Sequence, residues 1–247
     1  MPNTSIQIDR NRILSRQASE DARQYVYRVI KYCILEMLLI PGQKLNEADM
    51  AQTLNVSRTP VHDTILRLSR EHLVDIFPRR GAFVARISRR SIEEAVWTHR
   101  QMGVSIIQSI YIRNTPASQL ETLYLPLSRI KDCLLHNEPG QAAHLFTEYY
   151  YSLYILAGDM DLIWQAVQGI DVDVRRLLFF AASKSPSVVM GFVYELTSLT
   201  EALIRRDNDN ACQIFSDHMS RMLLLIPLME KNAPDYFTDG SNKLEAS

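Results

Sequence analysis

Two short cationic clusters stand out among the polar residues of this chain. The first is the run Ser57-Arg58-Thr59 followed by His62, and the second is Arg79-Arg80-Gly81. An arginine can donate two hydrogen bonds to a guanine, and the free amides at the start of a helix can bind a phosphate. Glycine permits a positive φ, so it suits a hairpin tip whose neighbouring arginines contact phosphates or enter a minor groove. These residue types indicate contact with a nucleic acid.

The flanking sequence predicts the elements that position the first cluster. Residues 46–55 have helical spacing, with an N-cap type residue at the start and carboxylates in the first turn. A second helix begins at the cluster, where Pro60 is tolerated because first-turn amides have no intrahelical partner. Arg58 and His62 lie four residues apart on one face, so both are expected to point outward. The inner face consists of Val61, Ile65 and Leu68.

A predicted β-hairpin carries the second cluster, with strands at 74–76 and 83–85. Two helices followed by such a hairpin have the order of a winged helix-turn-helix, whose main use is to read duplex DNA. Each feature also has an ordinary explanation: Arg58 as an exposed helix residue, Gly81 as a hairpin glycine, and the two arginines as a solvated edge. Their occurrence together, in this order, favours DNA binding.

Residues 26–88 resemble the DNA-binding domain of the GntR family of bacterial transcription regulators. The resemblance is carried by PGQKLNEADMAQTLNVSRTPV and LVDIFPRRGAFVARIS. It implies a homodimer on a short palindrome of double-stranded DNA. The implied contacts come from Ser57, Arg58 and Thr59, from the position of His62, and from the wing around Gly81.

Two departures from the family pattern carry information. His62 stands where the family usually has arginine, which replaces an always charged bidentate donor by a shorter group that is neutral at pH 7. His72 stands at a helix end where the family usually has glycine, which predicts strain from a left-handed backbone there.

Length and composition predict a mainly α protein in four parts. We expect a mobile N-terminal arm at 1–18 and a winged helix-turn-helix of three helices and a β-hairpin at 19–88. An antiparallel bundle of six or seven helices for effector binding and dimerisation follows at 91–231, and a tail at 232–247. Capping boxes predict helix starts at Ser91 and Ser118, and Pro126 is expected to kink the second of these helices.

Charge divides between the two predicted domains. Residues 1–90 hold 15 Lys and Arg against 9 Asp and Glu, or +6, and residues 91–247 hold 12 against 19, or −7. A basic domain joined to an acidic one is the electrostatic pattern of a DNA-binding protein. Cys33, Cys133 and Cys212 lie far apart in apolar patterns, which predicts reduced core residues, with redox sensing as the alternative.

No secretory or membrane segment is predicted. The N-terminus is polar through Gln17, and the longest apolar run, Met222–Met229, is short and interrupted by Pro227. The sequence therefore predicts a cytoplasmic protein without a membrane partner.

Residues 92–226 resemble the ligand-binding domain of the FadR subgroup, through LYILAGDMDL, ELTSLTEALIRRDNDNA and SDHM. The resemblance implies a helical bundle around a cavity for a small metabolite, often a carboxylate held on a divalent metal. At the family's ligand positions the chain has Phe146, Tyr150 and Leu196, and only His218 remains. One histidine cannot hold an ion that requires three or four donors, so we predict no metal and no other cofactor.

The predicted effector pocket consists of these four residues with Arg100 and Arg175. It is either a site for an apolar or aromatic effector, with His218 and Tyr150 as hydrogen-bonding groups, or a former cavity filled by its own side chains. The two arginines are candidates for holding a carboxylate, and ion pairs with Glu93, Glu94 or Asp171 are the alternative.

Catalysis finds no support in the sequence. His99, His136 and His144 lie in helical stretches without a Ser or Cys nucleophile in a recognised turn, and eight glycines leave little room for a phosphate loop. We predict a sequence-specific transcription regulator, a repressor rather than an activator, whose operator affinity responds to the effector. The alternative is a ligand-binding or adaptor protein whose DNA-binding domain has lost specificity, for which His62 is the best argument.

Overall fold

The computed structural model describes residues 14–239. Its described residues form two compact units, one comprising 14–87 and 235–237, the other comprising 88–234 and 238–239. Most of the predicted arm and the last eight residues of the predicted tail lie outside the described residues. The described part of the tail is ordered structure, with a 3-10 turn at Pro234–Tyr236 and a short strand β5 at Phe237–Thr238.

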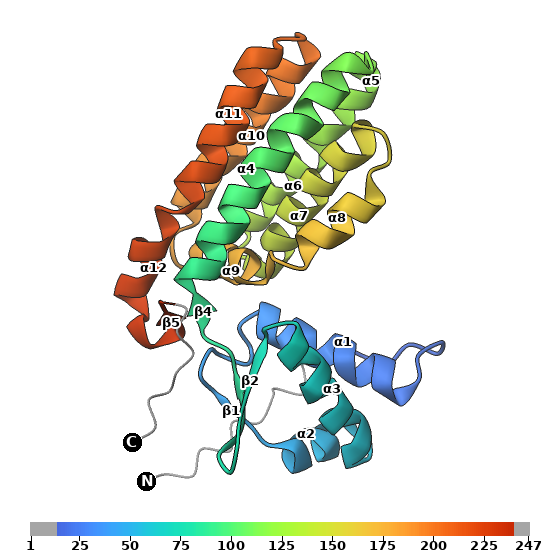
Figure 1. The fold of residues 1–247 in the computed structure, drawn as a ribbon, viewed down its shortest axis with the longest axis vertical. Coiled ribbons are helices and arrows are strands. Elements are labelled where there is room, and N and C mark those ends of the chain that lie inside the picture. The colour runs from blue at the N-terminus through green and yellow to red at the C-terminus, as the bar shows by residue number, and fades with distance from the viewer. Residues whose placement is uncertain (1–13, 240–247) are drawn as a thin grey trace. The chain divides into compact units, whose positions relative to one another are not determined.

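The first unit is a winged helix-turn-helix (Figure 1), as the sequence predicts. Its three-stranded antiparallel sheet has the order β1-β3-β2, and Ile76 pairs with Ala82 in the hairpin. The third strand was not predicted, because β1 is only two residues long and Lys44 pairs with the distant Phe83. The elements are α1 (Ala22–Leu35), β1 (Lys44–Leu45), α2 (Glu47–Leu54), α3 (Arg58–Arg70), β2 (Val74–Phe77) and β3 (Gly81–Val84).

The helix boundaries around α2 and α3 follow the local sequence. The Asn46 side chain accepts hydrogen bonds from the amides of Ala48 and Asp49 at the start of α2. The helix ends at Asn55 with φ 53°, a left-handed conformation that asparagine tolerates. The predicted inner face of α3 is confirmed, since its three residues are fully or almost fully buried: Val61, Ile65 and Leu68.

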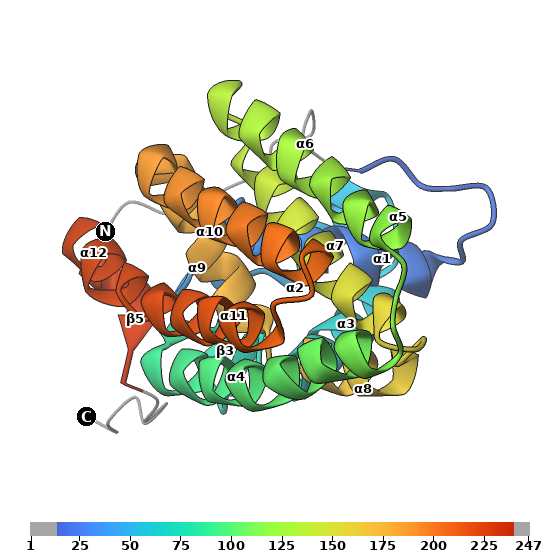
Figure 2. The same ribbon diagram turned by 90° about the horizontal axis from the view of Figure 1, so that it is seen from above.

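The second unit is an all-helical bundle (Figures 1 and 2). Figure 2 shows α4 and α11 side by side, and α10 packs against α6, α9 and α11. A two-residue strand β4 (Ile87–Ser88), which pairs with β5, leads into it. The helices of its described residues are α4 (Arg89–Ile112), α5 (Ala117–Leu120), α6 (Tyr124–Leu135), α7 (Pro139–Leu156), α8 (Asp161–Gln168), α9 (Val172–Lys184), α10 (Pro186–Ile204), α11 (Asn208–Met222) and α12 (Leu225–Asn232).

The two predicted capping boxes do not start helices. Helix α4 begins earlier, because Ser88 rather than Ser91 is its N-cap and accepts a bond from the Ser91 amide. At the predicted start at Ser118, the N-cap residue of α5 is instead Pro116. Among the described residues, no side chain caps this helix start. Instead of a kinked helix, α5 and α6 are separate, and Pro126 lies in the first turn of α6, where a missing amide hydrogen costs little.

Helix α10 is long and apolar enough to span a membrane, with a mean hydropathy of 1.3 over its best window. The sequence analysis did not single out this segment. In the structure its buried residues, which include Val193, Leu196 and Leu199, belong to the core of the bundle. The long apolar stretch is therefore explained by packing inside the second unit.

The three cysteines are free thiols, with Cys33 and Cys133 buried and Cys212 partly exposed. Burial raises the pKa of the Cys33 thiol to about 12, so this sulfur stays protonated at neutral pH. Cys33 and Cys133 have the predicted core positions, whereas Cys212 is only partly buried.

Candidate nucleic-acid interface and buried polar core

The start of α3 presents polar groups to solvent. Ser57 is the N-cap residue by its backbone conformation, with φ −72° and ψ 167°. Within the described residues its hydroxyl makes no capping bond, and Ser57, Arg58 and Thr59 are all exposed. The first-turn amides therefore have neither an intrahelical acceptor nor a side-chain cap. Such a helix start can bind a phosphate and direct an arginine to a base.

His62 lies one turn further along α3 and is fixed by a partner on α2. Its Nδ1 atom is 3.2 Å from Oε1 of Glu47, and both side chains are more than one-third exposed. Because a carboxylate only accepts hydrogen bonds, the Nδ1 atom of His62 is the one that carries the hydrogen in this contact. Glu47 is one of the predicted first-turn carboxylates of α2, and its contact with His62 joins two helices and was not predicted.

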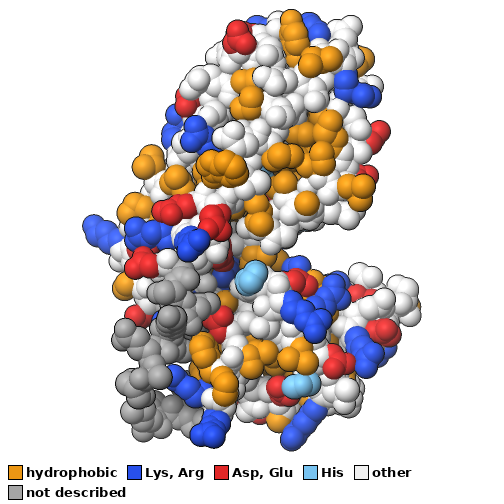
Figure 3. All heavy atoms as spheres, in the orientation of Figure 1, with side chains coloured by type: hydrophobic (Ala, Val, Ile, Leu, Met, Phe, Trp, Pro, Cys, Tyr) orange, Lys and Arg blue, Asp and Glu red, His pale blue; other side chains and the backbone are white. Residues whose placement is uncertain are grey.

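The wing has the predicted turn. Arg79 has φ 64° and Gly81 has φ 102°. Both residues, which flank Arg80, therefore have a positive φ, which glycine adopts most easily. Arg79 and Arg80 are exposed, and the ring of Phe77 lies edge-on to that of Phe83 at 5.8 Å between centroids. Figure 3 shows Lys and Arg side chains at the end of this unit that holds the hairpin tip and α2.

A polar cluster fixes α3 against α1. The hydroxyl of Tyr27 donates to Glu71 at 2.7 Å, Lys31 contacts the same carboxylate at 2.6 Å, and the guanidinium of Arg67 stacks 3.5 Å from the Tyr27 ring centroid. Burial raises the pKa of Glu71, but the bonds from Lys31 and Tyr27 outweigh it, so the net pKa is lowered. Arg67 is therefore engaged within the unit, unlike the cationic residues at the other end of α3.

In the second unit, a chain of hydrogen bonds runs through the core. The Tyr150 hydroxyl on α7 lies 2.7 Å from Nε2 of His218 on α11, and Nδ1 of His218 lies 2.8 Å from Glu195 on α10. Arg221 contacts the other oxygen of Glu195 at 2.6 Å. His218 is fully buried, and three aromatic rings surround this chain: Tyr149, Phe192 and Phe215.

Burial determines the protonation of this chain. It lowers the pKa of His218, and the hydrogen bond that His218 donates to Glu195 opposes this without reversing it. Burial raises the pKa of Tyr150 well above its usual value. For Glu195 burial raises the pKa, but His218 and Arg221 lower it by more, so this carboxylate stays ionised.

Of the six residues predicted for the effector pocket, Tyr150 and His218 are in contact, and two more are buried on the helices that carry this chain. Phe146, Tyr150, Leu196 and His218 are buried on α7, α10 and α11. Arg100 is not brought to them: it is exposed on α4 and donates from Nε to the Ser216 hydroxyl at 3.2 Å. Arg175 lies half-buried on α9.

The residues present do not fit a divalent metal. Phe146 and Leu196 offer no donor, and both nitrogens of His218 are engaged, by Tyr150 and by Glu195. Within residues 14–239 no group of three His, Cys, Asp or Glu side chains is arranged to hold an ion. The donor set therefore falls short of what zinc or a similar ion requires.

Two further buried pairs were not found from the sequence. His99 contacts Asp171 at 2.5 Å between Nε2 and Oδ1, which satisfies a histidine that the sequence left without a partner. Asp173 accepts a hydrogen bond from the Ser88 amide at 2.9 Å and pairs with the fully buried Arg176. His99 and Ser88 are 72 and 85 residues from their aspartates, so no local pattern indicates these two contacts, whereas Asp173 and Arg176 are three residues apart on α9.

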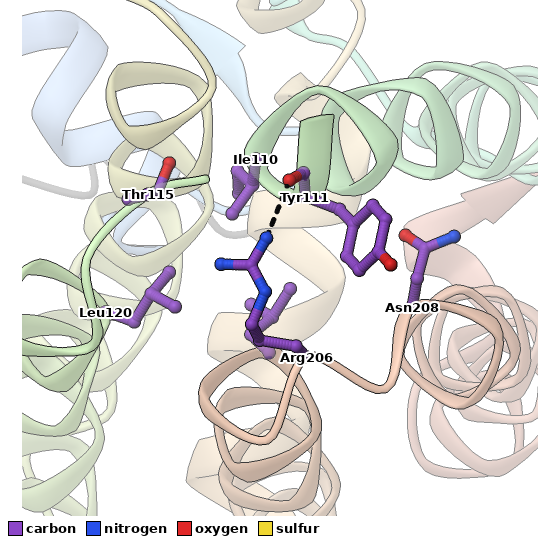
Figure 4. A pocket seen from close by; sticks show the side chains of 7 residues that line it. Ile110, Tyr111, Thr115, Leu120, Arg206 and Asn208 are labelled. Atoms are coloured by element: carbon purple, nitrogen blue, oxygen red, sulfur yellow. Dashed lines mark hydrogen bonds between the residues drawn. The ribbon is translucent and has the colours of Figure 1, made fainter. Parts of the chain in front are cut away.

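A small pocket with a volume of about 10 Å³ lies elsewhere in the bundle (Figure 4). It is formed where α4 ends and α10 turns into α11, and Figure 4 shows the Arg206 guanidinium directed to the Tyr111 carbonyl. That hydrogen bond is 3.0 Å long, and Arg206 also lies 5.1 Å from the Tyr111 ring centroid. Ligand pockets are typically larger, at about 300 Å³ or more, and here the cation is already engaged.

Fold and exposed residues together define a winged helix-turn-helix DNA-binding protein with a helical second domain. Residues 22–84 match the family model described as bacterial regulatory proteins, gntR family. Residues 22–84 are therefore a GntR-type DNA-binding domain, and the chain has the order of a GntR-type transcriptional regulator, a DNA-binding domain followed by a helical domain. It is a transcription regulator and not an enzyme, as the sequence predicts.

One curated relative matches most of the chain, and another matches a shorter part at higher identity. The HTH-type transcriptional repressor RspR of Escherichia coli (strain K12) is 21% identical over 226 residues, 90% of this chain and 96% of that protein. An HTH-type regulator from the TAR-I ttuE-ttuC' intergenic region of Agrobacterium vitis is 37% identical over 68 residues, 28% of this chain and 40% of that protein.

Solved structures show the same fold. The Escherichia coli protein McbR/YncC matches with a TM-score of 0.69 at 16% identity, covering 86% of this chain and 99% of that one. A putative GntR transcriptional regulator from Rhodococcus sp. RHA1 matches with a TM-score of 0.68 at 17% identity, covering 83% of this chain and 97% of that one.

Proposed function

We propose that the protein is a cytoplasmic repressor that binds a palindromic operator as a homodimer. The observation that carries this proposal is the uncapped, exposed start of α3, where Arg58 is flanked by two hydroxyl side chains. The relative RspR is named a repressor. A protein that covers promoter DNA blocks polymerase without any further contact, which favours repression.

Each DNA-facing residue has a role that follows from its chemistry. Arg58 donates to a guanine edge in the major groove, and Ser57 and Thr59 contact the adjacent phosphates. His62 contacts a base one turn further along α3. The wing tip binds the backbone or the minor groove through Arg79 and Arg80, and Gly81 permits the tip conformation.

The test is selection of bound DNA from a random pool, followed by competition between the selected site and random DNA. We expect a palindrome, and we expect Arg58→Ala to weaken operator binding about 10- to 100-fold with a smaller effect on random DNA. Arg129→Ala, which removes a half-exposed arginine from α6, is the matched control and should bind like the wild type.

Equal binding of operator and random DNA would support the alternative of an adaptor with a non-specific DNA-binding domain. The sign of regulation is tested with a reporter gene behind the selected operator. Repression predicts a rise in reporter expression when the Arg58→Ala variant replaces the wild type. A fall in expression would indicate activation.

We also propose that a small apolar or aromatic effector acts through the core around Tyr150 and His218, without a metal ion. The buried aromatic rings support such a ligand, which would have to displace side chains that now contact each other. The dimer can place its two DNA-binding domains in more than one relative arrangement. An effector that binds the protein more tightly in one arrangement than in another would shift the population and so change operator affinity.

The metal part of this proposal has a direct test. Elemental analysis of purified protein should find far less than one zinc, nickel or manganese per chain, and a chelator should leave operator affinity unchanged. One tightly bound metal per chain, lost with operator affinity on chelation, would overturn it and leave the DNA-binding proposal standing.

A further inference from the structure

Lys44, in the short strand β1, lies on the outer face of the wing sheet. Strand β1 pairs with β3 on the side away from β2, with Lys44 opposite Phe83 and Leu45 opposite Ala82. Paired residues of an antiparallel sheet direct their side chains to the same face. Leu45 and Ala82 are buried, so Lys44 and Phe83 belong to the solvent side, and Lys44 is exposed.

The Lys44 side chain extends toward the tip of the hairpin. Its Cε atom lies 3.4 Å from the position that a Cβ atom would have on Gly81. Gly81 is two residues closer to the tip than Phe83, the register partner of Lys44, which is about 7 Å along the strand. The ammonium nitrogen is bonded to Cε, so it lies at the hairpin tip, beside the residue that follows Arg80.

Two aromatic rings on this face lie beneath the cations. Phe77 pairs with Gly81 in the register, so it shares the face of Lys44, and its half-buried ring contacts that of Phe83. The guanidinium of Arg80 lies 6.0 Å from the Phe77 ring centroid. A long cationic side chain covers such an apolar surface with its stem and keeps its charged end in water. Arg80 and Lys44 therefore present their charges on one side of the sheet.

The charge of Lys44 is not neutralised within its unit. Among residues 14–239, Lys44 forms no ion pair and no hydrogen bond. Asp75 shares its row of the sheet but lies on β2, two strands away, at about 9–10 Å for the usual strand spacing. Lys31, the other lysine of residues 14–87, contacts Glu71 at 2.6 Å. Lys44 is therefore the lysine of this unit that is available to a ligand.

The backbone holds Lys44 in a fixed position on the hairpin. The Val84 amide donates to the Gln43 carbonyl at 2.8 Å, and the Gly42 amide donates to the Val84 carbonyl at 2.8 Å. On the other side of Lys44, the buried Leu45 anchors the strand in the core. Only the lysine side chain has to be ordered when a ligand binds, which keeps the entropic cost of binding small.

We infer that Lys44 binds a DNA phosphate together with Arg79 and Arg80, so that two separate segments of the chain form the basic site at the wing tip. The inference rests on the DNA binding of the proposed function and adds a contact residue from outside α3 and the hairpin. The ligand is a phosphate because an ammonium group is a compact point charge, without the planar fork by which arginine reads guanine. Lys44 therefore contributes affinity and not sequence specificity.

The test is the salt dependence of DNA binding by the full chain, measured by fluorescence anisotropy on the selected operator and on random DNA. Lys44→Gln keeps most of the side-chain stem and removes the charge. We expect it to reduce the magnitude of the slope of log affinity against log salt concentration by about 1 on both DNAs. For one contact, this slope corresponds to about an 8-fold change in affinity between about 1 M and about 0.1 M salt. Lys44→Arg should keep the wild-type slope.

Arg70→Ala is the matched control. It removes one positive charge from an exposed residue of the same unit, at the opposite end of α3 from Arg58. We expect it to leave both slopes unchanged, because that end of the helix is distant from the wing tip. Thermal unfolding checks that Lys44→Gln folds, and Lys44→Thr, with a residue that favours strands, replaces it if it does not.

The outcomes separate this inference from the proposed function. Unchanged slopes in Lys44→Gln, with a wild type that binds its operator, would overturn the inference and leave the proposed function intact. An equal loss of slope in Arg70→Ala would also overturn it, because the effect would then be one of overall charge. Weaker binding of the operator alone would assign Lys44 to a base and overturn the phosphate contact. A wild type without preference for any DNA sequence would overturn the proposed regulator, whereas the slopes on random DNA would still decide the role of Lys44.

Discussion

The imidazole of His62 differs from an arginine in what it can recognise. Nδ1 of His62 donates its hydrogen to Oε1 of Glu47 over an N–O distance of 3.2 Å. In a neutral imidazole with its hydrogen on Nδ1, Nε2 is an acceptor. In the major groove an acceptor matches the amino group of adenine or cytosine, whereas arginine matches the two acceptors of guanine. A single change of residue type therefore changes the base that this position prefers.

We expect His62→Arg to shift the preferred base toward guanine at one position of each half-site, and to tighten binding to that new site. The measurement is selection from a random pool with both proteins. Glu47→Gln is the control, because it leaves His62 in place. The glutamine amide can either donate to or accept from Nδ1 of His62, so the hydrogen of the imidazole is no longer held on Nδ1. An unchanged footprint and affinity in His62→Arg would show that this residue does not contact DNA.

His218 links the stability of the helical unit to pH. Its pKa is lowered in the folded state by burial, so below the unfolded value of about 6.5 the unfolded chain binds a proton that the folded chain does not. Stability should therefore fall as the pH drops below about 6.5, by at most about 1.4 kcal/mol for each pH unit. The lowered pKa of Glu195 acts only at more acidic pH, through its own ionisation.

Urea unfolding at about pH 7.5 and pH 5.5 measures this effect. We expect the wild type to lose more stability between the two values than His218→Gln, whose amide can keep a hydrogen bond to Glu195 but does not titrate. Equal losses in the two proteins would contradict the assignment to His218. Other histidines, such as the exposed His144, remain in both proteins and cancel in the comparison.

At the scale of the element, the end of α3 carries a residue with an unfavourable backbone conformation. His72 has φ 58° directly after the C-cap Glu71, a left-handed conformation that glycine adopts without cost. The strain predicted from the family pattern is thus confirmed. It lies between the recognition helix and the first strand of the wing, at the turn that joins them.

We expect His72→Gly to raise the free energy of unfolding by about 0.5–1 kcal/mol, because relief of the strain exceeds the added entropy of the unfolded chain. Chemical denaturation of the full chain is the measurement. Asn55→Gly is the control, since Asn55 has a similar φ of 53° but asparagine tolerates it, and its change should be smaller. A destabilised His72→Gly would show that the imidazole makes contacts that outweigh the strain.

Elements that depend on local sequence could be predicted, and contacts between distant residues could not. The limits of α2 follow from its capping residues, and the inner face of α3 follows from the spacing of its apolar residues. The wing turn follows from the glycine at its tip. The helix start at Ser88 is set by tertiary contact, since its amide bonds to Asp173 85 residues away. A capping box at Ser91 looks equally good locally, so the sequence alone cannot decide between the two starts.

The same distinction applies to the candidate sites. The exposed residues of α3 and the wing are predictable because one helix and one hairpin position them. The chain from Tyr150 to His218 and Glu195 joins α7, α11 and α10, and the pairing of His62 with Glu47 joins α3 and α2. The residue types at these positions were evident, but their partners depend on how the helices pack.

For the whole molecule, the division of charge sets how it searches DNA. The first 90 residues, most of which belong to the unit that reads DNA, carry +6 and the remainder carries −7, so the phosphate backbone attracts mainly this part of the chain. A chain with net charge −1 would otherwise have little general affinity for a polyanion. Non-specific affinity should therefore depend on a few residues of this unit, including the two arginines of the wing tip.

We expect the double substitution Arg79→Ala with Arg80→Ala to weaken binding to operator and random DNA by similar factors, because phosphate contacts carry no sequence information. The slope of log affinity against log salt concentration should decrease in magnitude by about 2, one for each lost phosphate contact. Titrations at several salt concentrations, with both DNAs, measure the slopes and the specificity ratio together. Arg129→Ala again serves as the control for loss of a distant arginine. If the double variant lost operator binding but kept its affinity for random DNA, the wing would be reading bases, and the assignment of specificity to α3 alone would be wrong.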